Sequence, residues 1–144
     1  MNLVAQYTPS ISGEVLCPGD KSISQRAVII GSLLNEDIEI SGFLNGEDPI
    51  STANALNAIG SSIKINGTSV SIKKRDIPFK DPSVNVDLGN SGTGMRLMMG
   101  LISSLGIKAT LVGDESLTKR PMLRVANPLN DMGAKVICNE GRPP

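Results

Sequence analysis

One pattern in the chain occurs twice, 73 positions apart. Residues 56–60 (LNAIG) return as residues 129–133 (LNDMG), and alternating apolar residues follow each copy. Before each copy, the apolar spacing predicts the same order of elements, namely strand, helix, strand and helix. Repetition on this scale is typical of a domain built from copies of one α/β unit. We therefore expect sheets covered by helices, with a chance similarity of two helix ends as the alternative.

Capping residues predict two helices in the first copy. The first helix runs over about 24–34, with Ser22 or Ser24 as its N-cap, because a serine oxygen satisfies a free N–H of the first turn. The second helix begins with Asp48 as N-cap and Pro49 at the first helical position.

Short alternating stretches predict the strands of the first copy. One strand lies over 38–40, and residues 63–65 and 70–72 flank an Asn-Gly pair that is typical of a hairpin. Residues 73–82 are polar and rich in proline, so we expect a connector there.

The second copy predicts strands over 84–88, 109–112 and 134–137. Its first helix is capped by Asn90 or Ser91, and its apolar face consists of Met95, Met98, Met99, Ile102 and Leu105. Its second helix starts at Pro121 and contains Pro128, which should kink or split it. The residues that we expect to face inward on this helix are Met122, Val125, Leu129 and Met132.

The repeat leaves the second copy without its last strand. The counterpart of residues 68–72 would begin at Gly141, and the sequence ends at Pro144. We therefore expect an N-terminal piece of a longer protein. Residues 14–82 would be its first unit, and residues 83–144 would be a second unit truncated before its last strand.

Composition excludes several classes of function. The 144 residues carry 14 basic and 14 acidic side chains, which argues against a nucleic-acid binder with a basic face. Aromatic residues make up only 2% of the chain, so stacking platforms for bases are not expected. The chain has no histidine, which excludes a histidine-based triad or zinc site. Cys17 and Cys138 are far apart, as expected for free thiols in a reducing cytosol.

Residues 18–26 (PGDKSISQR) have the features of an anion site. A Pro-Gly turn and two serines precede an apolar helical pattern, and the start of a helix attracts anions. Lys21 and Arg26 add two positive charges there. An ordinary capped helix with solvated cations is the alternative.

Two further stretches combine a helix start with basic residues. Residues 88–96 (LGNSGTGMR) form a glycine-rich turn whose spacing fits neither the dinucleotide fingerprint nor the Walker A loop. Lys119 and Arg120 precede the Pro121 helix. Three such sites in a neutral chain indicate a substrate, or a substrate pair, with several negative charges.

These motifs resemble one known family over essentially the whole chain. The segments 18–27 (PGDKSISQRA), 89–96 (GNSGTGMR) and 117–122 (LTKRPM) are similar to those of the 5-enolpyruvylshikimate-3-phosphate synthases. The resemblance implies the enolpyruvyl transferase fold, an inside-out α/β barrel with three βαβαββ units in each of two domains. This chain would then be an incomplete domain, and residues 1–13 would be a strand segment of the other, mostly absent, domain.

The resemblance also implies a reaction. The enolpyruvyl group of phosphoenolpyruvate moves to the 5-hydroxyl of shikimate-3-phosphate and phosphate is released, a step of the shikimate pathway of aromatic amino-acid biosynthesis. The family needs no metal or organic cofactor. We expect small-molecule substrates as the only partners, no nucleic acid or membrane, a cytoplasmic location and a monomeric full-length protein.

The resemblance assigns roles residue by residue. Lys21 would be catalytic and contact both substrates, while Ser22 and Arg26 would hold shikimate-3-phosphate. The Gly92 backbone N–H and Arg120 would bind the phosphate of phosphoenolpyruvate. The residues that would shape the surrounding turn are Asn90, Thr93 and Arg96.

This chain departs from the family pattern in two respects. Gln25 stands where many members have histidine, and by the resemblance the carboxylates that transfer protons would lie beyond Pro144. We therefore expect the 144 residues alone to be inactive. Gly92 matches a position where larger residues weaken binding of glyphosate, so the full-length enzyme is expected to be a glyphosate target. A stand-alone binding module for a small phosphorylated ligand, or a structural repeat with solvated cations, are the alternatives.

Overall fold

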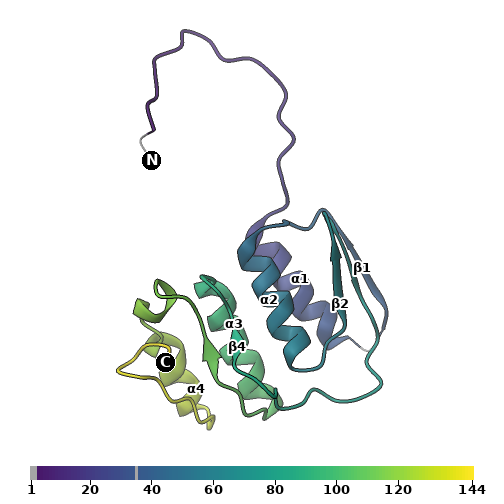
Figure 1. Cartoon of the computed structure of the whole chain (residues 1–144), viewed down its shortest axis with the longest axis vertical. Helices are drawn as coiled ribbons and strands as arrows, with labels where there is room; N and C mark the ends of the chain where they lie inside the picture. The colour runs from purple at the N-terminus through teal and green to yellow at the C-terminus, as the bar shows by residue number, and fades with distance from the viewer. Residues whose placement is uncertain (1–2, 35) are drawn as a thin grey trace.

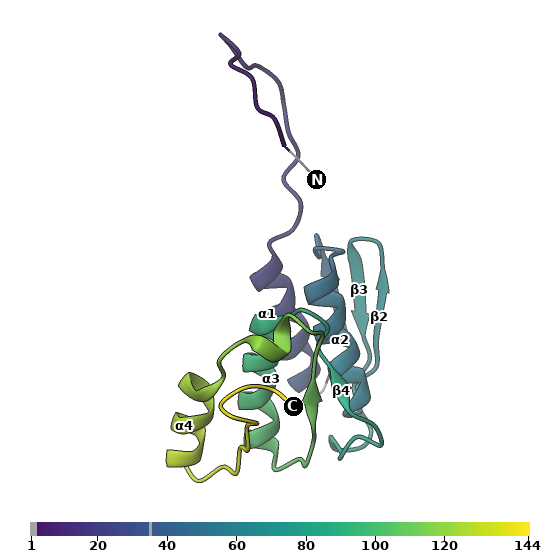
Figure 2. The same ribbon diagram turned by 60° about the vertical axis from the view of Figure 1, so that its left-hand side comes forward.

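A computed structural model describes residues 3–34 and 36–144 of the chain, which form two units of mixed α and β structure (Figure 1). The first unit consists of α1 (Lys21–Leu33), β1 (Ile38–Ser41), α2 (Glu47–Ala58), β2 (Ile63–Asn66) and β3 (Ser69–Ile72). The second unit consists of β4 (Val86–Asp87), α3 (Gly92–Leu105), β5 (Leu111–Val112), the 3-10 helix η1 (Leu117–Lys119) and α4 (Leu123–Asp131). Helix α3 lies between α2 and α4 in both views, so the two units pack through their helices (Figure 2).

The sheet of the first unit has β3 at its centre, paired antiparallel with β1 on one side and β2 on the other. Val70 and Ile72 of β3 are buried while Ser69 is exposed, as expected for a strand with one face against helices. The predicted hairpin is confirmed, with Asn66 opposite Ser69 and Gly67 in the turn at a φ of 58°.

Helix α3 supplies much of the core of the second unit. Its N-cap is Ser91, and it ends at Gly106 in the left-handed conformation, with a φ of 67°. Both features confirm the sequence prediction. The predicted apolar face is also confirmed, because Met95, Met98, Met99 and Ile102 are buried and Leu105 packs against them.

The strands of the second unit are shorter than expected. Strands β4 and β5 are two residues each and pair in parallel. The strand predicted over 134–137 is not present, because an extended segment becomes a strand only when a neighbour completes its hydrogen bonds. A single antiparallel bridge joins Asn139 to Arg142, at the positions that correspond to Asn66 and Ser69 in the first hairpin.

Both helices of the first unit begin earlier than predicted, with other caps. Helix α1 starts at Lys21 because Asp20 caps it, with its Oδ1 accepting a hydrogen bond from the Ile23 N–H at 2.7 Å. Ser22 and Ser24 are therefore not N-caps. Helix α2 starts after Gly46, without a side-chain cap, so the assignment of Asp48 as N-cap was wrong.

Residues in the first turn of α2 explain its start. Asp48 interacts favourably with the positive end of the helix dipole. Pro49 lacks an N–H, but N–H groups of the first turn have no partner inside a helix. The turn therefore forms without the predicted cap.

Helix α4 also differs from the prediction. It begins at Leu123 rather than at Pro121, and the Met122 N–H donates to the carbonyl of Gly141 at 2.8 Å. Pro128 lies inside the helix without splitting it. Met132 is 83% exposed and does not face inward, because it lies just past the last helical residue.

The N-terminal segment is extended and leads away from the helices and strands in both views. It forms no strand over residues 3–20. Its apolar side chains are strongly exposed, namely Leu3, Val4, Tyr7, Ile11, Val15 and Leu16. Within the described residues, no helix combines the length and the apolar character that crossing a membrane requires.

Candidate functional site

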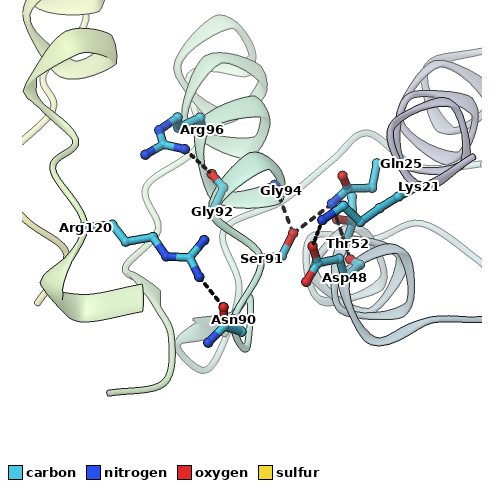
Figure 3. A network of polar contacts seen from close by, with 10 residues as sticks. All are labelled: Lys21, Gln25, Asp48, Thr52, Asn90, Ser91, Gly92, Gly94, Arg96 and Arg120. Atoms are coloured by element: carbon cyan, nitrogen blue, oxygen red, sulfur yellow. Dashed lines mark hydrogen bonds and ion pairs between the residues drawn. The ribbon is translucent and has the colours of Figure 1, made fainter. Parts of the chain in front are cut away.

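Three helix starts meet around the buried side chain of Gln25. Gln25 Nε2 donates to Thr52 Oγ1 at 2.9 Å and to Ser91 Oγ at 2.7 Å, and thereby joins the second turns of α1 and α2 to the N-cap of α3 (Figure 3). Each helix start carries a partial positive charge. The arrangement gathers three of these charges at one place.

Gly94 allows this close approach. The oxygen of the N-cap Ser91 accepts from the Gly94 N–H at 3.0 Å. A Cβ at position 94 would lie 2.7 Å from both Ser91 Oγ and Thr52 Oγ1. A side chain at this position would therefore push α3 away from α2.

The cations of α1 are exposed and already have polar partners. Lys21 Nζ forms an ion pair with Asp48 Oδ2 at 2.8 Å, and the lysine side chain is 55% exposed. One turn later, Arg26 Nη1 donates to Ser22 Oγ. Lys21, Ser22 and Arg26 are thus grouped at the first turns of α1, next to Gln25. An anion bound there would share or replace the ion pair with Asp48.

Two arginines lie across the glycine-rich turn at the start of α3. A Cβ added to Gly92 would be 2.7 Å from Arg120 Nη1 and 3.3 Å from Arg96 Nη1. Arg120 donates to Asn90 Oδ1, and Arg96 lies 3.4 Å from the carbonyl oxygens of Gly92 and Pro121 (Figure 3). The Gly92 N–H itself donates to the Asn90 carbonyl at 2.9 Å.

The arginines at this turn form no direct ion pair with an acid in the described part of the chain. Burial, and then the charges of Arg124 and Arg120, lower the pKa of Arg96. Across residues 3–34 and 36–144, the ion pairs involve Lys21, Lys73 and Lys119 and none of these arginines. A guanidinium stays protonated at neutral pH, so this cluster attracts an anion.

Among the described residues, neither Thr93 nor Lys119 forms a hydrogen bond or ion pair with these arginines. The Thr93 side chain is exposed on the first turn of α3. Lys119 pairs with Glu115 at 2.6 Å, four residues earlier, so its charge is balanced locally. A hollow of about 680 Å³ between α3 and residues 133–138 contains none of the predicted site residues.

Sequence reasoning assigned no role to three residues of the site. Thr52 and Gln25 form the buried contact, and Asp114 accepts from Asn90 Nδ2 at 2.7 Å. The Leu117 N–H also donates to Asp114 at 2.7 Å. An acid three residues before a helical turn is typical of a capping residue, and this pattern could have identified Asp114 from the sequence. The hydrogen bond from Asn90, followed by that from the Leu117 N–H, holds the pKa of Asp114 below its usual range. In the described part of the chain, no group of acidic and cysteine side chains is placed to hold a metal ion.

Curated proteins similar to the chain are about three times as long. A 3-phosphoshikimate 1-carboxyvinyltransferase of Ruthia magnifica subsp. Calyptogena magnifica is 47% identical over 142 residues, which is 98% of this chain and 33% of the relative. The protein of the same description from Thermoanaerobacter sp. (strain X514) is 44% identical over 141 residues, again 98% of this chain and 33% of the relative. The chain therefore spans about a third of the length of these relatives.

Solved structures and a family model agree with these relatives. An EPSP synthase structure from Acinetobacter baumannii superposes with a TM-score of 0.83 at 38% identity, covering 92% of this chain and 31% of that one. The family model described as EPSP synthase (3-phosphoshikimate 1-carboxyvinyltransferase) matches residues 6–144. On this match, the chain belongs to the EPSP synthase family.

Proposed function

We propose that this chain forms part of the substrate-binding wall of a 3-phosphoshikimate 1-carboxyvinyltransferase. The complete enzyme transfers the enolpyruvyl group of phosphoenolpyruvate to the 5-hydroxyl of shikimate-3-phosphate and releases phosphate. Membership of the family supports this reaction, and the gathered cations suit two substrates that each carry a phosphate and a carboxylate. The enzyme acts in the cytoplasm as a monomer and needs no cofactor.

The first turns of α1 hold shikimate-3-phosphate. Ser22 and Arg26 are neighbours on one side of the helix, and Arg26 offers a planar set of donors that matches a carboxylate or a phosphate. Lys21, in the first turn of the same helix, contacts both substrates and exchanges its ion pair with Asp48 for them.

The start of α3 holds the phosphate of phosphoenolpyruvate. The observation that carries this proposal is the pair Arg96 and Arg120, which lie across Gly92 and form no ion pair among the described residues. Glycine at 92 lets the guanidinium of Arg120 lie against the backbone of the turn, because a Cβ there would come within 2.7 Å of its Nη1. Asn90, with Thr93 on the same turn, shapes the loop around it. Donors fixed in advance stabilise the charge that shifts as phosphate departs.

A binding experiment tests the function. The 144-residue chain and the product of the complete reading frame that encodes it are each titrated with shikimate-3-phosphate, and phosphate release is measured with phosphoenolpyruvate added. We expect turnover only from the complete product, and weak or no binding by the 144 residues alone. Tight binding by the 144 residues would instead indicate a stand-alone binding module. No binding by either protein would overturn the proposal.

Neighbouring cations offer a matched pair of variants for the complete product. Arg120→Ala removes a phosphate donor, and we expect the affinity for phosphoenolpyruvate to fall about 10- to 100-fold, as for loss of a charge-assisted hydrogen bond. Lys119→Ala removes the same charge one residue away, where Glu115 already balances it, and should leave the affinity unchanged. Equal effects of the two variants would contradict the assignment of Arg120.

A further inference from the structure

Asp114 lies behind Arg120, with the side chain of Asn90 between them. Asn90 Nδ2 donates to Asp114 Oδ2 at 2.7 Å, and Asn90 Oδ1 accepts from Arg120. We propose that Asp114 is a positioning residue that acts through Asn90 to orient the Arg120 guanidinium toward an anion at Gly92. This inference rests on the proposed function of that turn and adds a residue to which no role has been assigned.

Backbone contacts make Asp114 a link between two segments. Its N–H donates to the Gly89 carbonyl at 2.9 Å, and its carbonyl accepts from the Thr118 N–H at 3.0 Å. Its second carboxylate oxygen, Oδ1, accepts a hydrogen bond from the Leu117 N–H. Asp114 therefore ties the glycine-rich turn to η1, the element that Arg120 directly follows.

The order acid, amide, guanidinium has a chemical reason. An ionised carboxylate only accepts hydrogen bonds, so it makes Asn90 turn its NH₂ toward Asp114. The amide oxygen is then left for Arg120. A carboxylate in direct contact with Arg120 would compete with an incoming anion, whereas a neutral amide orients the guanidinium and leaves its charge available.

The first unit shows that the fold does not require this arrangement. The residue just before the N-cap is Asn90 at α3 but Gly19 at α1, which has no side chain to make such a contact. The first unit still forms two helices and a sheet in the same order. The chain of contacts from Asp114 through Asn90 to Arg120, which we call the relay, therefore belongs to the second unit alone. The arginines that form no ion pair lie in the same unit.

Asp114→Asn tests the relay without any ligand. The new amide can still accept from the Leu117 N–H with its oxygen, but its NH₂ would face the NH₂ of Asn90. Asn90 must then turn, and Arg120 loses its acceptor. In the ¹⁵N-labelled 144-residue chain, NMR relaxation should show an ordered Arg120 Nε–H in the original protein and a mobile one in the variant.

Two further variants keep the test decisive. Asn90→Ala leaves the carboxylate and its bond to Leu117 in place, and should also free Arg120 even where Asp114→Asn fails to fold. Asp131→Asn removes the same charge from an exposed residue of α4 and should leave Arg120 ordered. An Arg120 side chain that is equally ordered in Asp114→Asn and in the original chain would overturn the proposal.

The double variant Asn90→Asp with Asp114→Asn separates orientation from charge. The new carboxylate at position 90 can accept from both the new amide and Arg120, so Arg120 should become ordered again. Direct pairing would balance its charge, so binding of inorganic phosphate should stay weak. A double variant that leaves Arg120 mobile would count against the relay.

Titration of the complete product with inorganic phosphate connects the contact from Asp114 through Asn90 to the proposed function. We expect Asp114→Asn to weaken phosphate binding about tenfold, the loss of one charge-assisted hydrogen bond, while Asp131→Asn should bind like the complete product without substitutions. Unchanged binding in Asp114→Asn would overturn the positioning role. No binding by the complete product without these substitutions would count against the phosphate site, and the relaxation data would still decide whether Asp114 holds Arg120.

Discussion

The two units share the same contacts where their second helix ends, which we call the frame, but the segments that follow differ. Near the end of α2, the Asn57 side chain makes two hydrogen bonds to the backbone of Ile63, at 2.8 and 3.0 Å. Near the end of α4, Asn130 makes the same two bonds to Val136, at 2.7 and 3.0 Å. The frame leads into a three-stranded sheet in the first unit, and into a single bridge in the second.

The charged groups of the two units differ more than the frame does. At the start of α1, Lys21 has an acidic partner in Asp48. At the start of α3, Arg96 and Arg120 have none among the described residues. Positions that hold the frame recur at the same offset, whereas positions that line the proposed site do not. Differences between the copies therefore point to function.

The largest effect should come from the sheet that only the first unit completes. Ile72 is 2% exposed and lies opposite both Ile38 and Ile63. Ile72→Ala should lower the free energy of unfolding by about 2–5 kcal/mol, through lost burial and a cavity. Urea unfolding followed by circular dichroism measures this. Ile137→Ala, at an 80% exposed residue of the second unit, should change it by less than about 0.5 kcal/mol; similar losses in both would refute the contrast.

The next largest loss of stability should come from a substitution at the contact between the two units. Gly94→Ala places a methyl group 2.7 Å from Ser91 Oγ and Thr52 Oγ1, and should cost about 1–3 kcal/mol as the helices move apart. Gly100 lies in the same helix with no atom within 4 Å of a Cβ. Gly100→Ala should stabilise the chain by up to about 1 kcal/mol. Melting temperatures that move in the same direction for both variants would contradict the close approach.

The hydrogen bonds of Asn57 and Asn130 should contribute different amounts to the free energy of unfolding. Asn57→Ala leaves partly buried backbone groups of Ile63 without partners, at a cost of about 1–2 kcal/mol. Asn130→Ala exposes its partner groups to water, which replaces the lost bonds, and should cost about 0.5 kcal/mol. Chemical denaturation of the two variants compares them. An equal cost would mean that both frames are equally buried.

The smallest effect should come from an exposed ion pair of the first unit. The hydrogen bond from Lys73 lowers the pKa of Asp37, so the folded state binds the proton less tightly than the unfolded state. The contribution to stability is present at neutral pH and is lost as the pH falls below the ordinary carboxyl value of 3.8. Asp37→Asn should slightly reduce the fall in melting temperature at acidic pH. This difference between the variant and the original chain should be smaller in high salt. The exposed Asp76→Asn is the control, and an effect as large in that variant would rule out the ion pair as the cause.

Local patterns predicted the elements whose signals lie within a few residues. The apolar spacing of α3, its Ser91 cap and its Gly106 end were all readable from the sequence, as was the hairpin around Gly67. The errors arose where a local signal had competitors. Serines near residue 22 were preferred as caps, but Asp20 reaches the Ile23 N–H, and the alternating pattern over 134–137 has no partner to make it a strand.

The candidate site was predictable as a set of residues but not as an arrangement. Lys21, Gly92 and Arg120 were identified from motifs, and the structure groups Gly92 and Arg120 directly. Asp114 escaped notice because its importance comes from Asn90, 24 positions away. No spacing in the sequence indicates such a contact.

By itself, the sequence determined the hairpin around Gly67, the approximate course of the helices and which side chains carry a charge. These properties follow from backbone conformation and hydrogen bonds over three or four residues. Only the tertiary structure decided which cations keep their charge available. Lys21 is balanced by Asp48, 27 positions away, while Arg120 faces a neutral amide. Packing of the helices brings these groups together, and the charge of a site depends on that packing rather than on any local pattern.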